Sequence, residues 1–248
     1  MNTPFSLFGK TILVTGASSG IGKSIAIECS RMGAQLILTA RNNQRLQETL
    51  SLLDGGEHVV FVADLTNDEE LTSLVDFLPK LDGVVFNAGI SKPIVLSLTD
   101  KEDVNDMIET NLLSTINLTR FLVQQKKLKK KSSLVYISSI NGNSCSSFGS
   151  SLYAASKAAI TGFMKGVALE LSSKEIRVNS INPGMIETEI FKGSAIGEEE
   201  LTKDRQKYPL KRYGKPEEVA YAAIFLLSDA TQWITGSSLL IDGGYTLQ

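Results

Sequence analysis

The chain has 248 residues, of which 42% are hydrophobic, with 25 basic and 27 acidic side chains and a formal net charge of −2. This balanced charge argues against a nucleic-acid or anionic-membrane partner, and no apolar run approaches the roughly 20 residues of a membrane span. The single histidine, His58, argues against a histidine-based triad and a multi-histidine metal site. We therefore expect no metal, and acid–base chemistry that uses Tyr, Lys, Ser or carboxylate side chains.

Only two cysteines are present. Cys29 occupies an apolar position of a predicted helix, and Cys145 lies in a serine-rich loop. We expect both thiols to be reduced in a cytoplasmic protein without a disulfide.

Short apolar runs alternate with amphipathic segments along the chain. The runs at 11–14, 35–39, 59–62, 83–86, 133–137, 176–181 and 238–241 predict strands, and the segments at 20–32, 42–53, 67–78, 100–128, 152–173 and 216–228 predict helices. The strands are mostly apolar on both faces, as expected where helices cover both sides. The alternation predicts an α/β fold with one doubly wound parallel sheet, a three-layer Rossmann fold, in a single domain over residues 1–248.

The longest irregular stretch covers about residues 184–215 and is rich in glycine and proline. A loop of this length in a compact domain is typical of a binding loop, so we expect a substrate lid here. Its middle part, Glu198 to Lys207, is compatible with a short helix.

A glycine-rich turn, TGASSGIG at residues 15–22, joins the first predicted strand to the first helix. Gly16 permits the turn, Gly20 lets a phosphate approach the main chain, and Gly22 allows close packing of helix and strand. The free amides and positive dipole of the helix start favour an anion. The turn thus predicts a pyrophosphate site, although its spacing differs from GxGxxG and an ordinary glycine-rich loop is the alternative.

Three further segments lie at strand ends or at a helix start: residues 86–89 (FNAG), 150–159 (SSLYAASKAA) and 178–184 (VNSINPG). Doubly wound sheets bind ligands at this edge. Tyr153 and Lys157 are four residues apart and therefore share one face of a helix. On its own, this pair is more typical of a surface tyrosine over a lysine stem.

Taken together, these segments resemble the short-chain dehydrogenase/reductase family, and in particular its 3-oxoacyl-carrier-protein reductases. The resemblance covers nearly the whole chain. Residues 15–22 match the family's TGxxxGxG loop, and Asn87-Ala88-Gly89 match its NAG signature. Asn111 matches the helix asparagine, Ser139 matches the catalytic serine, and Tyr153 with Lys157 match the YxxxK motif. Pro183-Gly184 with Thr188 match the PGxxxT segment, and residues 235–244 resemble the last strand.

The resemblance implies an oxidoreductase that transfers a hydride between a nicotinamide and a carbonyl or alcohol, with Tyr153 as acid/base. A neighbouring ammonium favours a phenolate, so Lys157 is expected to lower the pKa of Tyr153 from its usual value near 10. The resemblance also implies that Lys157 holds ribose hydroxyls, that Ser139 binds the substrate oxygen, and that Asn111 holds a water. Ser139 precedes Tyr153 by fourteen residues, where thirteen is commoner, which leaves Ser138 as the alternative catalytic serine.

The second strand bears on the choice of cofactor, because it ends at Ala40 and Arg41 rather than at a carboxylate. An arginine fork suits a 2′-phosphate, which favours NADP(H); a solvated loop cation is the alternative. The expected cofactor-binding residues are Gly16, Ser18, Ser19, Gly20, Ile21, Gly22, Arg41, Asp64, Leu65, Asn87, Ala88, Gly89, Tyr153, Lys157, Pro183, Gly184, Ile186 and Thr188.

A cationic run, Lys126 to Lys131, is expected at the end of the long helix 100–128, where it either complements the helix dipole or, with Lys174, docks an acidic acyl-carrier protein.

The resemblance also implies a homotetramer, built through the helices 100–128 and 152–173 and the last strand. A sugar or polyol dehydrogenase, or a non-catalytic NADP-binding regulator, is the alternative function; the regulator is disfavoured because no residue of the catalytic set is lost.

Overall fold

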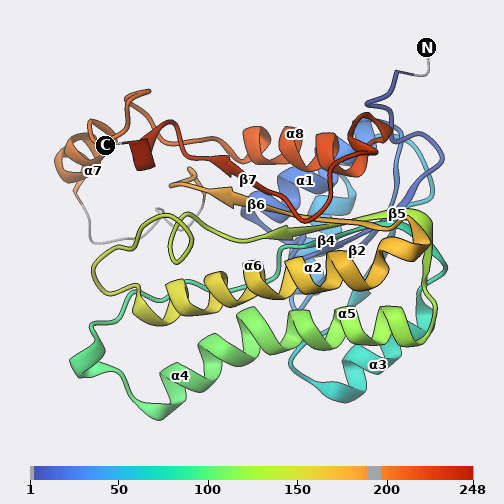
Figure 1. Cartoon of the computed structure of the whole chain (residues 1–248), viewed down its shortest axis with the longest axis horizontal. Helices are drawn as coiled ribbons and strands as arrows, with labels where there is room; N and C mark the ends of the chain where they lie inside the picture. The colour runs from blue at the N-terminus through green and yellow to red at the C-terminus, as the bar shows by residue number, and fades with distance from the viewer. Residues whose placement is uncertain (1–2, 189–196, 248) are drawn as a thin grey trace.

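The computed structural model describes residues 3–188 and 197–247, and these form one parallel sheet between two layers of helices (Figure 1). The seven strands lie in the order β3-β2-β1-β4-β5-β6-β7, and every pair is parallel. The order reverses direction at β1, as in a doubly wound sheet, so the predicted fold is confirmed. The strands are β1 (Thr11–Thr15), β2 (Gln35–Ala40), β3 (Val59–Val62), β4 (Leu81–Phe86), β5 (Leu128–Ile137), β6 (Arg177–Pro183) and β7 (Ser238–Ile241).

Two apolar clusters attach the helices to the two faces of the sheet. Alternate residues of β1 point to opposite sides: Ile12 and Val14 belong to one cluster and Leu13 to the other. The first cluster lies under α1 (Gly20–Arg31), α2 (Asn43–Leu50) and α8 (Pro216–Leu227). The second lies under α3 (Asp68–Phe77), α5 (Ser114–Gln124) and α6 (Ser151–Leu171). Burial on both faces explains why the strands lack polar alternation.

The predicted helix over residues 100–128 is divided in the structure. Asp100 caps α4 (Lys101–Ile108) in a reciprocal capping box with Asp103. A π-helical turn, Glu109–Leu113, then links α4 to α5. α7 (Glu198–Arg205) confirms the short helix expected within the long segment 184–215, whereas residues 189–196 of that segment lie outside the described residues.

The prediction that Lys126 to Lys131 end a helix is wrong. α5 ends at Gln124, and Lys126 adopts a left-handed conformation with φ of 55°. The amide of Lys127 donates to the Leu122 carbonyl at 2.9 Å and that of Lys126 to Val123 at 3.2 Å, the pattern of a Schellman termination. β5 then starts at Leu128, which pairs with Leu81, five residues earlier than predicted.

No helix among the described residues is long and apolar enough to cross a membrane.

Candidate functional site

The glycine-rich turn packs against the end of β4. Gly16 has φ of +64°, and a Cβ there would lie 2.9 Å from both Ala88 Cα and Asn87 Nδ2. A Cβ on Gly22 would overlap the Gly16 carbonyl and the Asn87 amide. Larger residues would therefore push the turn off β4, and both glycines are required sterically.

A hydrogen-bonded junction holds the ends of β1 and β4 together. The Thr15 hydroxyl accepts from the amides of Asn87 at 2.9 Å and Ala88 at 3.0 Å, while Asn87 Nδ2 donates to the carbonyls of Thr15 and Gly16, each at 3.2 Å. The side chain of Asn87 thus faces the turn rather than solvent. Thr15 has no role in the sequence prediction, although it lies inside the matched motif and the residue is 1% exposed.

The first turn of α1 keeps polar groups available. Ser19 stands at the N-cap in an extended conformation, but its side chain makes no capping bond. The first amides of any helix have no intrahelical acceptor. Ser18, Ser19 and Gly20 line a cavity of about 850 Å³, and these groups fit a dinucleotide pyrophosphate.

The loop after β6 closes over the same turn. Thr188 Cγ2 would lie 3.4 Å from a Cβ placed on Gly20, so this loop and the glycine-rich turn are neighbours. The amide of Gly184 donates to the Ile241 carbonyl of β7, and Ile186 pairs with Gly214. The predicted PGxxxT residues are thereby brought to the carboxyl edge of the sheet.

Arg41 and Asp64 follow β2 and β3 and lie close together. Arg41 Nη1 is 3.8 Å from Asp64 Oδ2, and two thirds of the Arg41 side chain is exposed. Asp64 is also held locally, since its Oδ1 accepts from the Thr66 amide and hydroxyl at 3.0 and 2.8 Å. Leu65 is buried beside it, at 9% exposure.

Helix α6 and the end of β5 bring three predicted catalytic residues together. Tyr153 and Lys157 lie one turn apart, with Lys157 Nζ 5.8 Å from the centre of the Tyr153 ring. Lys157 is only 6% exposed, and its ammonium donates to the Ile137 carbonyl at 2.9 Å. The Ser139 side chain lies near enough to the Tyr153 phenol to lower its pKa.

Burial dominates the titration behaviour of this cluster. Burial raises the pKa of Tyr153 above its ordinary value, and the Ser139 side chain lowers it only in part. The expectation that Lys157 lowers this pKa is therefore not met in the structure. Burial also lowers the pKa of Lys157 itself to about 8. A tyrosine with a raised pKa stays protonated at neutral pH, the form that donates a proton.

The local contacts decide between the two serines. The Ser138 hydroxyl donates to the Lys157 carbonyl at 2.9 Å and shares a hydrogen bond with Thr161 at 3.1 Å, so it faces the body of α6. The Ser139 hydroxyl faces Tyr153 and accepts from the Asn141 amide at 3.1 Å. Ser139 is therefore the serine that faces the tyrosine.

Asn111 lies in the π-helical turn, 1% exposed, and its side chain is fully engaged. Its Oδ1 accepts from the Ile90 amide at 2.7 Å, and its Nδ2 donates to the Ile90 carbonyl at 2.9 Å and to Ser156 Oγ at 3.1 Å. Ser156, which the sequence prediction did not include, in turn donates to the Tyr153 carbonyl at 2.7 Å. Asn111 thus joins the loop after β4 to α6, and its main-chain carbonyl accepts from the Thr115 hydroxyl at 3.3 Å.

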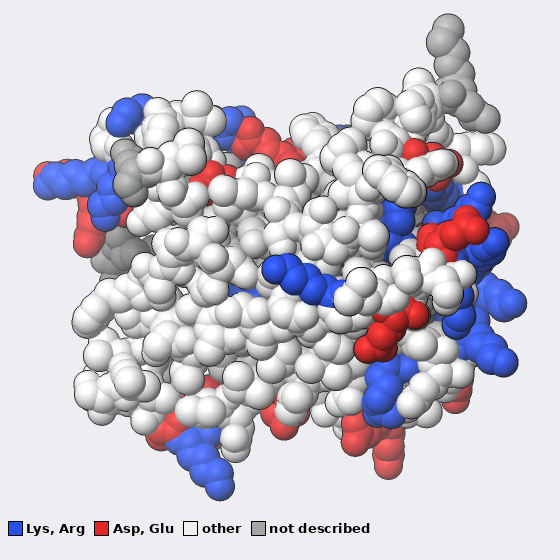
Figure 2. Space-filling model, in the orientation of Figure 1, with Lys and Arg blue, Asp and Glu red and all other residues white. Residues whose placement is uncertain are grey.

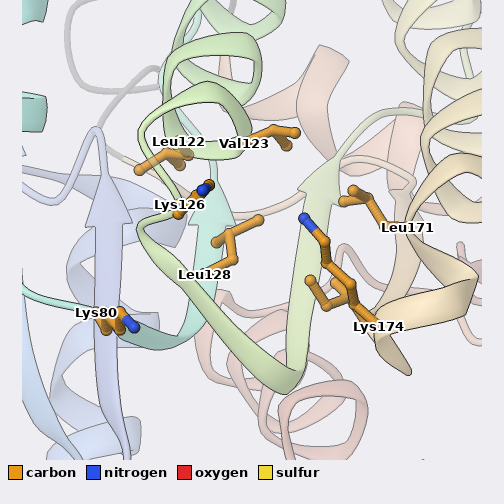
Figure 3. A pocket seen from close by; sticks show the side chains of 8 residues that line it. Lys80, Leu122, Val123, Lys126, Leu128, Leu171 and Lys174 are labelled. Atoms are coloured by element: carbon orange, nitrogen blue, oxygen red, sulfur yellow. The ribbon is translucent and has the colours of Figure 1, made fainter.

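A second feature lies at the opposite, amino edge of the sheet, where a cavity of about 260 Å³ opens between the starts of β4, β5 and β6 (Figure 3). Its walls are Leu122, Val123, Leu128, Leu171 and Ile176, and three lysines, Lys80, Lys126 and Lys174, surround it. Acidic and basic side chains mix at the right-hand side of Figure 2, where this edge lies.

The fold and the carboxyl-edge cluster define a dinucleotide-binding oxidoreductase of the Rossmann type. The family model described as enoyl-(acyl carrier protein) reductase matches residues 16–246. The chain therefore belongs to the short-chain dehydrogenase/reductase family, whose members use a nicotinamide cofactor.

Two relatives are 3-oxoacyl-(acyl-carrier-protein) reductases FabG. The protein of Rickettsia felis is 34% identical over 238 residues, which cover 96% of this chain and 97% of the relative. That of Vibrio cholerae is 35% identical over 244 residues, covering 96% and 98%. Among solved structures, a dehydrogenase/reductase from Sinorhizobium meliloti superposes with a TM-score of 0.89 at 32% identity, covering 98% of this chain and 97% of that one.

Proposed function

We propose that the protein is an NADP(H)-dependent reductase that converts a carbonyl, in particular that of a 3-oxoacyl thioester, to an alcohol. The observation that carries this proposal is the cluster of Ser139, Tyr153 and Lys157 beside the glycine-rich turn. The nicotinamide would supply the hydride. The chain's own residues then have to orient the substrate and manage one proton.

In this proposal Ser139 donates a hydrogen bond to the substrate oxygen, and the Tyr153 phenol donates the proton that the developing alkoxide takes up. The raised pKa of Tyr153 supports the acid role, because the phenol is protonated before the reaction. Lys157 holds ribose hydroxyls and stabilises the phenolate that proton donation leaves behind. The Asn111 carbonyl holds a water that returns a proton by way of Lys157.

The preference for NADP(H) rests on the end of β2. Neither Thr39 nor Ala40 offers a carboxylate to a ribose 2′-hydroxyl, and the exposed guanidinium of Arg41 is available to a 2′-phosphate. Asp64 and Leu65 would line the adenine side. The 3.8 Å separation between Arg41 and Asp64 is longer than a charged hydrogen bond, so Arg41 is not committed to this carboxylate.

The substrate class is tested by NADPH oxidation with a panel of acetoacetyl thioester, 2-enoyl thioester, diketone, keto-sugar and steroid. We expect the acetoacetyl thioester to give the highest kcat/KM. Preference for a keto-sugar would favour a sugar or polyol dehydrogenase instead. No turnover with any member, together with tight NADPH binding, would favour a non-catalytic regulator.

An acyl-carrier protein is the proposed partner, since the FabG relatives are named for it. The docking lysines, however, are not the whole predicted run. Lys129 pairs with Asp82 at 2.7 Å, and Lys130 and Lys131 both reach Glu175. Among residues 3–188 and 197–247, the cavity lysines Lys80, Lys126 and Lys174 have no carboxylate within 4.0 Å, which leaves them available to acidic side chains of a carrier.

We further propose a cytoplasmic homotetramer. Cys29 and Cys145 are free thiols, as expected in a reducing compartment. Leu169 on α6 is 78% exposed and Trp233, before β7, is 100% exposed, so apolar side chains lie near both expected interfaces. Light scattering is expected to give four times the 26.9 kDa of one chain; a stable monomer at micromolar concentration would contradict this.

A further inference from the structure

Asn143, which follows the proposed catalytic serine by four residues, makes two side-chain hydrogen bonds to that segment. Its Nδ2 donates to the Ser139 carbonyl at 2.9 Å and to the Ser138 hydroxyl at 3.1 Å. A side-chain amide nitrogen has two hydrogens, and both are used here. The reversed orientation of the amide would set its oxygen against the Ser139 carbonyl, so the donor assignment follows from the chemistry.

These two bonds belong to a larger contact between the serine loop and α6. The Ser138 hydroxyl in turn donates to the Lys157 carbonyl and shares a hydrogen bond with the Thr161 hydroxyl, both on α6. Gly142, with φ of +85°, lies so close to α6 that a Cβ there would overlap the Ala154 carbonyl. The loop is therefore pressed onto the helix beside Tyr153, and the amide of Asn143 ties this loop to the Ser138–Ser139 segment.

We infer that Asn143 is a positioning residue for the proposed catalytic serine: its amide ties the Ser139 main chain to the loop that Gly142 packs onto α6, so that the Ser139 hydroxyl faces the Tyr153 phenol. This inference goes beyond the proposed function but rests on the roles proposed there for Ser139 and Tyr153. Lys157 lies on α6 with Tyr153 and is a charged group beside the phenol. Ser139 approaches the phenol from the end of β5. Asn143 touches neither the phenol nor the ammonium in the described contacts, so it acts through the serine.

The test compares Asn143→Ala and Asn143→Asp with wild type. The aspartate keeps the shape of the side chain but removes both donors and faces the Ser139 carbonyl with an acceptor. We expect kcat to fall about tenfold in both variants, as for loss of the one hydrogen bond that holds the Ser139 main chain, with the dissociation constant of NADPH changed by less than about twofold. Ser147→Ala, in the same loop but without contact to Ser138 or Ser139, is the matched control and should retain the wild-type rate.

The pH profile separates positioning from a merely structural role. The Ser139 side chain lowers the pKa of Tyr153, so displacing Ser139 should raise this pKa and move the base-dependent limb of alcohol oxidation to higher pH. The inference is overturned if kcat falls while the base-dependent limb stays at the same pH, or if kcat itself does not change.

Loss of folding in the Asn143 variants would be seen in thermal melts, and Ser138→Ala then provides the second route. Ser138→Ala leaves the hydrogen bond between Asn143 and the Ser139 carbonyl in place, so the base-dependent limb of the pH profile should move little. A large shift of this limb to higher pH would contradict the inference. If Ser139→Ala itself keeps the wild-type rate, it is the proposed function that fails.

Discussion

The two edges of the sheet both carry lysines, but in opposite environments. At the carboxyl edge Lys157 is 6% exposed and donates to a main-chain carbonyl, and among the described residues no carboxylate pairs with it. At the amino edge Lys129, Lys130 and Lys131 are partly or largely exposed and lie beside Asp82 or Glu175. Burial lowers the pKa of Lys157 to about 8. An exposed pair contributes little to stability, whereas a buried charge without a counter-charge makes its site sensitive to proton transfer.

The topology accounts for this division. In a parallel sheet, the carboxyl ends of the strands meet the starts of helices, where free amides favour anions such as phosphates. The amino ends meet the ends of helices, whose carbonyls favour cations. Lys127 illustrates this, because its ammonium donates to the carbonyls of Asp76 and Leu78 at 3.0 and 2.6 Å, at the end of α3.

Removing Tyr153, the proposed proton donor of the carboxyl edge, should have the largest effect. We expect Tyr153→Phe to lower kcat by about 10²–10⁴-fold, the usual contribution of general acid–base catalysis. The ring is retained, so the affinity for NADPH should stay within about threefold. Stopped-flow reduction and fluorescence titration measure the two quantities. Retention of more than a tenth of the wild-type rate would show that another group donates the proton.

The buried charge itself should be visible in the pH dependence of stability. Because the pKa of Lys157 in the folded state lies below its unfolded value of 10.5, the charged form opposes folding at neutral pH, and this cost disappears as the pH rises from about 8 towards 10.5. Relative to wild type, Lys157→Met should therefore lose about 3 kcal/mol of unfolding free energy between pH 7 and pH 10.5. Urea titrations at both values measure this. Lys129→Met, at the amino edge, is the control, and an equal change in both variants would contradict the comparison.

Arg41 tests whether an exposed cation at the carboxyl edge has a ligand. A charged hydrogen bond contributes about 1.5–3 kcal/mol, so Arg41→Ala should weaken NADPH binding by about 10- to 150-fold. NADH, which lacks the 2′-phosphate, should be affected much less, and the further change Ala40→Asp should favour NADH. Equal weakening of both cofactors would identify Arg41 as a solvated loop cation.

The smallest effect is expected at the amino edge. Lys126→Gln combined with Lys174→Gln should raise the KM for a carrier-bound thioester by about three- to tenfold, as for two exposed charge pairs, without changing the KM for a free thioester. Lys130→Gln combined with Lys131→Gln removes the same charge, but from lysines that already face Glu175. An equal effect of the two double variants would mean that the whole run docks the carrier.

Several features of the site follow from local sequence. Gly16 and Gly22 are required because β4 lies against the turn, and the glycines are visible in the sequence together with the strand and helix that flank them. The spacing of Tyr153 and Lys157 places them on one face of α6 in any helical environment. The apolar runs predict the seven strands because the central ones are buried on both faces, while the edge strands β3 and β7 are apolar but only partly buried.

Other features depend on contacts between distant segments. Amphipathic periodicity continues through residues 100–128, yet the main chain turns at Lys126, because pairing of Leu128 with Leu81 requires the helix to end. The choice between Ser138 and Ser139, the engagement of the Asn111 side chain by Ile90, and the contacts of Asn143 all involve segments far apart in the chain or side-chain directions that no spacing determines.

The residue types proposed to perform the chemistry, and the order in which strands and helices present them, were determined by the sequence alone, since both depend on local patterns. The protonation behaviour was decided only by the tertiary structure. A lysine four residues from a tyrosine predicts a lowered phenol pKa when charge is the dominant influence. In the folded protein, packing of α6 onto β5 buries both groups, and desolvation raises the pKa of Tyr153 and lowers that of Lys157, because it disfavours whichever form is charged.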